Sequence, residues 1–225
     1  MKKLSELFWT CNTLCYDIVG KDVSYKFIEE GDILYIYLQG SYEKIDWLRN
    51  FYFFPTSKKP YRNMKISYRV HKGFLKAWKE LEDIVIEKIT EKDDIDCYKW
   101  KEIVVIGYSH GGALAALAIE CCWYYREDLR EDKLFGFGFE APRVYAGFRV
   151  KKELKERWKN FKVIRDNNDL VTHCPPRLFG FTHVGEIIKI NGDVSLVNNK
   201  LPKCLKSHFP DVVHDGLLKK EEEND

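Results

Sequence analysis

Apolar positions at three- and four-residue spacing predict two helices in the first part of the chain. Within residues 4–18 this spacing places one apolar face on a helix, made of Leu4, Leu7, Phe8, Cys11, Leu14, Cys15 and Ile18. We expect this face to pack against a core. Attachment to a membrane surface is the alternative, which the scarcity of lysine on the polar face disfavours. The second helix begins after Gly73 and runs to Ile89, before a charged cluster at residues 91–96.

Alternating apolar and polar residues predict strands beside these helices. Residues 23–28 and 33–39 alternate in this way, and residues 29–32, which include Gly31, separate them. A glycine-containing turn between two alternating runs is typical of a β-hairpin. A third strand is predicted at residues 65–70.

From residue 101 onward, strands and helices alternate. Residues 101–107 are a short β-branched apolar run, typical of a buried parallel strand. An alanine-rich helix follows, and then come a strand at residues 134–139, a polar helix at 151–159 and a strand at 161–165. This order predicts crossover units and a mostly parallel central sheet flanked by helices, which is an α/β fold.

Length and charge narrow the class of protein. The 225 residues predict one domain over residues 1–225, with a flexible charged tail at residues 219–225. Lysine and arginine number 37 against 35 acidic residues, a net charge of +2, which argues against a dedicated nucleic-acid binder. The longest apolar stretches fall well short of the roughly 20 residues that span a bilayer, and Glu6, Asn12 and Asp17 interrupt the first one, so we expect no export signal.

The cysteine count predicts a reducing, cytoplasmic setting. Seven cysteines are an odd number for a disulfide framework, and none of them form the C-x-x-C pairs that build zinc sites. The six histidines do not have the helical or hairpin spacing of metal ligands, so we expect no metal.

The strongest chemical signal is a G-x-S-x-G motif at residues 107–111, with Ser109 at its centre. It lies between the most strand-like segment and the most alanine-rich segment of the chain. A sharp strand-to-helix turn of this kind holds a serine hydroxyl above the edge of the sheet, and it needs glycine on both sides for close backbone approach. The motif therefore predicts a nucleophilic serine rather than an idle serine in a glycine-rich turn.

A serine nucleophile needs a histidine base and an acid that orients it, and in this architecture they follow the serine in the order acid, then histidine. Asp166 and Asp169, just past the predicted strand at 161–165, are the candidate acids. Asp169 has the better loop position, whereas Asp166 is as well explained as a turn or capping residue. Chain order disfavours His71 and His110 as the base and leaves His173, His183, His208 and His214. Among these His208 has the most suitable loop position, and His214 is the fallback.

Five blocks in this order resemble the class 3, or fungal-type, lipases of the α/β-hydrolase fold. They are LQGS at 38–41 with DWL at 46–48, VHKGF at 70–74, GYSHGGALA at 107–115, EAPRV at 140–144 and NDLVTHCPP at 168–176. The corresponding family patterns are R-G-T/S with D-W, V-H-x-G-F, G-H-S-L-G-G-A-L-A, G-S/A-P-R-V and N-D-I-V-x-x-L-P-P. The resemblance implies an α/β-hydrolase fold with Ser109 as nucleophile, Asp169 as triad acid and His208 as base.

The same resemblance implies the oxyanion hole. Its donors would be the backbone N–H of His110 and that of Ser41, with the Ser41 hydroxyl as a further candidate. The chain departs from the family at Tyr108, where histidine is common, and at Gln39, where arginine is frequent. The lid of larger relatives corresponds to residues 42–69, whose aromatic side chains would either pack or contact an acyl chain or lipid surface.

We therefore predict a lipase-like serine carboxylester hydrolase that cleaves acylglycerols or related lipid esters through an acyl-enzyme and needs no cofactor. Its partners would be a lipid or small ester substrate and, transiently, a membrane or lipid-droplet surface, and not nucleic acid. Two alternatives stay open. One is a catalytically inactive module that binds a lipid or a partner, and the other is a phospholipase or thioesterase variant.

Overall fold

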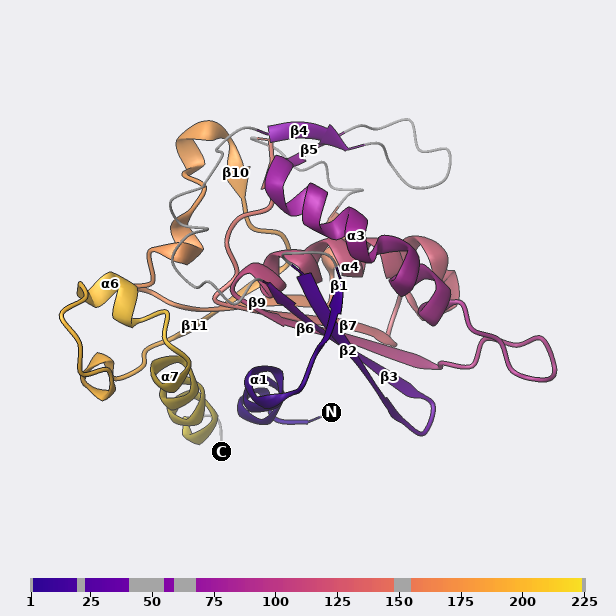
Figure 1. Ribbon diagram of the computed structural model, residues 1–225, viewed down its shortest axis with the longest axis horizontal. Helices are drawn as coiled ribbons and strands as arrows, with labels where there is room; N and C mark the ends of the chain where they lie inside the picture. Colours follow the sequence, from indigo (N-terminus) through magenta and orange to yellow (C-terminus); the bar gives the residue numbers. More distant parts are fainter. Residues whose placement is uncertain (1, 20–22, 41–54, 59–67, 148–154, 224–225) are drawn as a thin grey trace.

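The structure is a computed structural model that describes residues 2–19, 23–40, 55–58, 68–147 and 155–223. Within these ranges the central sheet has seven strands in the order β1-β2-β3-β6-β7-β9-β11. The strands are β1 (Asp17–Val19), β2 (Val23–Glu30), β3 (Ile33–Gly40), β6 (Glu102–Tyr108), β7 (Leu134–Phe139), β9 (Phe161–Asp166) and β11 (Glu186–Ile190). Figure 1 shows this sheet through the middle of the molecule.

The sheet is mostly parallel, as the alternating pattern predicts. β2 and β3 form the expected antiparallel hairpin, and β1 adds to it antiparallel. Every neighbouring pair from β3 to β11 is parallel. In the register of β3 and β6, Leu38 lies opposite Gly107, so the end of β3 adjoins the turn that carries Ser109.

Helices cover both faces of this sheet (Figure 1). α3 (Lys72–Ile89) and α4 (His110–Tyr125) lie on one face, and α1 (Leu4–Thr13) and α7 (Pro210–Glu222) lie on the other. α4 is buried on nearly every side because it lies between the sheet and α3, which explains its small apolar residues. On the other face Phe8 of α1 packs on Phe139, with ring centroids 5.1 Å apart.

Shorter elements complete the described chain. A second sheet has the order β10-β8-β5-β4. Its strands are β4 (Pro55–Lys58), β5 (Tyr68–His71), β8 (Tyr145–Ala146) and β10 (Phe181–Thr182). The short helices are η1 (Glu127–Leu129), η2 (Glu156–Trp158), η3 (Val171–His173), η4 (Arg177–Phe179), η5 (Val194–Leu196) and α6 (Lys203–Lys206).

The first predicted helix and the predicted tail differ from the structure. α1 ends at Thr13, and residues 17–19 form β1, because pairing with β2 offers their backbone an extended partner. Residues 219–222 are the last turn of α7, not part of a flexible tail. Glu221 ties this turn to α1 by accepting hydrogen bonds from the backbone N–H and the hydroxyl of Ser5, at 2.9 and 2.7 Å.

Two further predicted elements fall partly outside the described residues. Of the helix expected at 151–159, residues 156–158 form the 3₁₀ helix η2. Of the strand expected at 65–70, residues 68–70 belong to β5. No helix in the described ranges combines the length and the apolar character needed to cross a membrane.

Candidate active site

Ser109 lies at a sharp turn between β6 and α4. Its backbone has φ 56° and ψ −120°, a conformation that side-chain-bearing residues rarely adopt. The flanking glycines permit the close approach that this turn requires. A Cβ on Gly107 would lie 2.1 Å from the carbonyl oxygen of Gly111, and a Cβ on Gly111 would lie 2.0 Å from that of Leu38 in β3. The turn is therefore the strained strand-to-helix elbow that the motif predicts.

His208 lies in the segment between α6 and α7, and its side chain reaches the elbow. Its Nε2 lies 2.8 Å from Ser109 Oγ, and its Nδ1 lies 2.7 Å from Asp169 Oδ2. Because a carboxylate oxygen can only accept, Nδ1 carries the proton and Nε2 accepts from the serine hydroxyl. The structure thus brings the three predicted side chains together in one hydrogen-bonded chain.

Asp169 is fully buried in the loop that follows β9. Its Oδ1 accepts from the N–H of Val171 at 2.9 Å, while Oδ2 faces His208. Its carbonyl oxygen accepts from the Thr172 hydroxyl at 3.0 Å and from His173 Nδ1 at 2.8 Å. These contacts fix the carboxylate in its orientation, and they give His173, one of the candidate bases, a structural role in the acid loop.

His183 supports the same loop from outside the triad. Its Nε2 donates to the carbonyl oxygen of Thr172 at 2.9 Å. Burial lowers the pKa of His183 to about 3, with a smaller opposing effect from this hydrogen bond. The ring is therefore neutral over most of the pH range, as its role as a donor to a backbone carbonyl requires.

Asp166 and His214, the alternative acid and base, are engaged elsewhere. Asp166 ends β9 and accepts from the backbone N–H groups of Asn168 at 2.7 Å and Gly192 at 3.0 Å, which is the turn role considered for it. His214 lies on α7 with its ring 5.0 Å from that of Trp9. His71 caps α3 by accepting from the N–H of Phe74 at 3.3 Å.

Tyr108 contacts His208, the base, and this contact could not be predicted from the sequence. Its hydroxyl donates to the carbonyl oxygen of His208, and its ring stacks on the imidazole with centroids 5.2 Å apart and an interplanar angle of 23°. Burial raises the pKa of Tyr108 well above its ordinary value, so the phenol stays protonated as a donor. The residue that departs from the family pattern before the serine is thus a support for the histidine.

Of the two predicted oxyanion donors, one lies in the described residues and the other does not. The backbone N–H of His110 belongs to the first turn of α4, whose N–H groups point out of the N-terminal end of the helix next to Ser109. Ser41 lies outside the described residues, as does most of the predicted lid region at 42–69. Gly40, which precedes Ser41, ends β3 beside the elbow.

Glu140 is a site residue that sequence reasoning missed. It directly follows β7, has φ 46°, and is fully buried. One of its carboxyl oxygens, one from Asp169 and a ring nitrogen of His208 all lie within 4.8 Å of one another. The available signal was a charged residue directly after a buried strand, at a position where the family pattern has glycine.

Within the described ranges, Glu140, Asp169 and His208 are the one group of metal-ligating side chains close enough to hold an ion. Both ring nitrogens of His208 already make hydrogen bonds, to Asp169 and to Ser109. An ion bound by this ring would have to replace one of those contacts. The donor set as arranged therefore fits a proton relay rather than a metal centre.

Comparison with known proteins agrees with the elbow and the surrounding fold. The sequence model of the lipase (class 3) family matches residues 35–179. A lipase from Rhizomucor miehei is 31% identical over 184 residues, which cover 79% of this chain and 46% of that protein. A secreted mono- and diacylglycerol lipase from Malassezia restricta is 27% identical over 124 residues, which cover 55% of this chain and 38% of that protein. The chain thus spans about half or less of the length of these two relatives.

Solved structures show the same fold. The triacylglyceride lipase of Rhizomucor miehei superposes with a TM-score of 0.71 at 20% identity, over 95% of this chain and 94% of that one. A triacylglycerol lipase whose catalytic centre is described as a serine protease triad superposes with a TM-score of 0.67 at 22% identity, over 90% and 82%. The predicted α/β-hydrolase fold is confirmed. Together with the family match over residues 35–179, these findings show that the chain belongs to the class 3 lipase family.

Proposed function

We propose that the protein is a serine carboxylester hydrolase that cleaves lipid esters through an acyl-enzyme. The observation that carries the proposal is the hydrogen-bonded chain from Ser109 Oγ through His208 to Asp169, at 2.8 and 2.7 Å. This arrangement activates a hydroxyl that is a weak nucleophile on its own. The strained elbow gives the hydroxyl access to a substrate above the sheet edge.

The reaction has two halves. Ser109 Oγ attacks the ester carbonyl while its proton passes to His208 Nε2, and Asp169 stabilises the imidazolium that forms. The tetrahedral intermediate collapses as His208 returns the proton to the leaving alcohol. Water, activated by the same nitrogen, then releases the carboxylic acid and restores Ser109.

The negative oxygen of each intermediate needs preorganised donors, and removing one typically costs about 3 kcal/mol of barrier. We assign one donor to the backbone N–H of His110, in the first turn of α4. We propose the backbone N–H of Ser41 as the second, on the family pattern and on the position of Gly40 at the end of β3.

We propose acylglycerols or related lipid esters as substrates, presented at a lipid surface. The named relatives are a lipase and a mono- and diacylglycerol lipase. The segment that follows Asp169 also exposes large apolar side chains, with Leu170 44%, Leu178 84% and Phe179 52% accessible. Exposed apolar groups of this kind suit contact with an acyl chain or a membrane.

Covalent labelling tests the nucleophile. A fluorophosphonate probe should label the wild-type protein and not Ser109→Ala, and that variant should lose ester turnover while its unfolding transition is retained. Unchanged turnover in Ser109→Ala would remove the assignment. A wild-type protein that folds but takes no label would instead favour the inactive binding module.

The substrate class is tested by rates on p-nitrophenyl esters of increasing chain length, on acylglycerols, on phospholipids and on thioesters. Hydrolysis of acylglycerols is expected, whereas turnover restricted to phospholipids or thioesters would overturn the proposed class.

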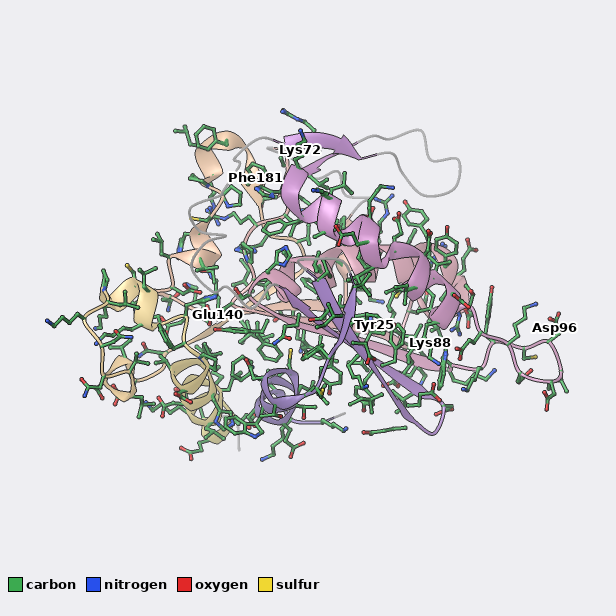
Figure 2. The ribbon with its side chains drawn as sticks, in the orientation of Figure 1. Tyr25, Lys72, Lys88, Asp96, Glu140 and Phe181 are labelled. Carbon is green, nitrogen blue, oxygen red and sulfur yellow. The ribbon has the colours of Figure 1, made fainter. Side chains whose placement is uncertain are left out.

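Surface contact is tested with Leu178→Asp, which should slow hydrolysis in anionic or zwitterionic vesicles but not of a dissolved short ester. Ile95→Asp is the matched control, because Ile95 is similarly exposed, at 78%, in the loop of Asp96 far from Glu140 (Figure 2). Equal slowing by both variants would contradict a specific contact surface.

We also propose a reducing, cytoplasmic location. None of the seven cysteines, all of which lie in the described part of the chain, forms a disulfide bond, and Cys11, Cys121 and Cys122 are buried. Burial raises the pKa of Cys11 and of Cys122 to about 12, so both stay unreactive. One relative is named a secreted lipase, so the location stays a prediction. Fractionation of the source cells tests it, and recovery in the medium would overturn it.

A further inference from the structure

We propose that Glu140 carries a proton on its buried carboxyl group and donates a hydrogen bond to Asp169, as a positioning residue for the triad acid. The inference rests on the proposed function only in that it gives Asp169 its catalytic role. Figure 2 labels Glu140 at the end of the sheet nearest to α6 and α7, which is the end from which His208 approaches.

The backbone holds Glu140 in place at a cost. Its φ of 46° lies in the left-handed region, which side-chain-bearing residues adopt only where their surroundings impose it. Its N–H donates to the carbonyl oxygen of Ile164 at 2.8 Å, which fixes the chain against β9. The side chain is directed into the protein, where it is fully buried.

One oxygen of the Glu140 carboxyl group lies within 4.8 Å of an oxygen of the Asp169 carboxyl group, and a hydrogen bond between the two side chains contributes to the raised pKa of Glu140. Both side chains are completely inaccessible to solvent. Two ionised carboxylates have no proton to share and repel each other strongly in a dry environment. The contact is stable only if one of the two groups is protonated.

The hydrogen bonds that the two carboxyl groups accept place the proton on Glu140 rather than on Asp169. Asp169 accepts from the N–H of Val171 at 2.9 Å and from His208 Nδ1 at 2.7 Å, both of which stabilise its ionised form. Glu140 Oε1 accepts from the N–H of Asp166 at 2.7 Å, and Oε2 has no donor among the described residues. The proton therefore belongs on Oε2, where it supplies the missing partner.

The electrostatic surroundings agree with this assignment. Burial raises the pKa of Glu140 well above its ordinary value, and the charge of Asp169 and its hydrogen bond add to the rise. Asp166 raises it further, while its backbone N–H opposes the shift. The other titratable groups at the site are His208 and the protonated phenol of Tyr108.

A neutral Glu140 would do two things for the triad. Its O–H fixes the rotation of the Asp169 carboxylate so that Oδ2 stays directed at His208. It also supports that carboxylate without adding a second negative charge, so the imidazolium is stabilised by one anion. The carboxyl group further links the Asp166 backbone to the triad acid, which ties the end of β9 to the site.

Two variants separate a proton donor from an anion. Glu140→Gln keeps an N–H donor for Asp169 and an oxygen for the Asp166 N–H, and it carries no charge. Glu140→Met keeps the length and removes both. We expect kcat within about threefold of wild type for Gln and about 10- to 100-fold lower for Met, with KM unchanged in both.

The pH profile of kcat/KM decides the charge. Replacing a neutral carboxyl group by a neutral amide leaves the midpoint of the acidic limb of this profile in place. If Glu140 were ionised, Glu140→Gln would remove a negative charge beside the imidazole and lower that midpoint by about one pH unit or more. A lowered midpoint, or a Gln variant as impaired as the Met variant, overturns the proposal.

An infrared measurement gives a readout that does not need activity. At pH 7 the wild type should show the carbonyl band of a buried protonated carboxyl group, and Glu140→Gln should lack it. The same band should appear in Ser109→Ala. This result separates the protonation of Glu140 from the proposed hydrolase function, because the carboxyl pair can exist even if Ser109 is not a nucleophile. Absence of the band from the wild type overturns the inference even if Glu140→Met fails to fold, and it leaves the labelling result for Ser109 unaffected.

Discussion

His183 should make the stability of the acid loop depend on pH. Its Nε2 donates to the carbonyl oxygen of Thr172, whose hydroxyl donates to the Asp169 carbonyl oxygen. Protonation would place a charge on a ring that burial keeps neutral, with its pKa lowered from 6.5 to about 3. The substitution His183→Gln keeps an amide N–H for Thr172 and removes the titration.

The direction of the stability change with pH follows from the number of protons that His183 binds in the folded and unfolded chains. In the unfolded chain His183 binds a proton below about pH 6.5, whereas in the folded chain it does so only near pH 3. Its contribution is therefore fully present above pH 6.5 and is lost progressively as the pH falls towards 3. With these two values, the loss between pH 7 and pH 5 is at most about 2 kcal/mol. Partial solvent access to the ring reduces this to about 1 to 2 kcal/mol.

Urea unfolding of wild type and His183→Gln at several pH values measures this effect. The difference in unfolding free energy between the two proteins cancels the other titrating groups, which both share. It should shift in favour of His183→Gln by about 1 to 2 kcal/mol between pH 7 and pH 5. A difference that stays constant over this range would refute a neutral buried His183.

Two further substitutions probe the elbow and the base. Tyr108→Phe removes the hydroxyl that donates to the His208 carbonyl oxygen but keeps the stacked ring, so kcat should fall about 5- to 10-fold with KM unchanged in steady-state assays. An unchanged kcat would show that stacking alone holds the base. Gly111→Ala places a Cβ 2.0 Å from the Leu38 oxygen and should cost more than about 3 kcal/mol in urea unfolding. Gly31→Ala is its control, because that Cβ meets nothing within 4 Å and only the φ of +62° is strained, at about 1 kcal/mol. Equal costs would contradict the close approach of β3 to the elbow.

The elbow and its strands could be predicted because local chemistry determines them. The β-branched run at residues 103–106 is typical of a buried strand, and the glycines of the motif are where the turn requires close backbone approach. Asp169 could be preferred over Asp166 because one residue ends a strand and the other lies in the loop beyond it. His208 could be preferred as the base from chain order and its loop position alone.

Elements defined by distant pairing could not be predicted in the same way. Residues 14–18 fit a helical spacing, yet Asp17 and Ile18 pair with β2 in a strand that periodicity does not reveal. β8 and β10 have two residues each, too short for any alternation, and they exist because β8 pairs with β5 and β10 pairs with β8. The last turn of α7 depends on Ser5, which is 216 residues away in the chain.

The burial of Glu140 beside Asp169 could not be predicted from the sequence. The sequence displays an acidic residue where the family pattern has glycine, and a charge at the end of a strand is ordinarily assigned to solvent. Only the parallel register of β7 and β9, with Phe139 opposite Ile164, places the next residue against the acid loop. The substitution brings two carboxyl groups together in a buried site, where electrostatics requires a shared proton. A departure from a motif in this chain is therefore best interpreted through the neighbours that the sheet gives it, since the same register that positions Asp169 also determines the protonation state of Glu140.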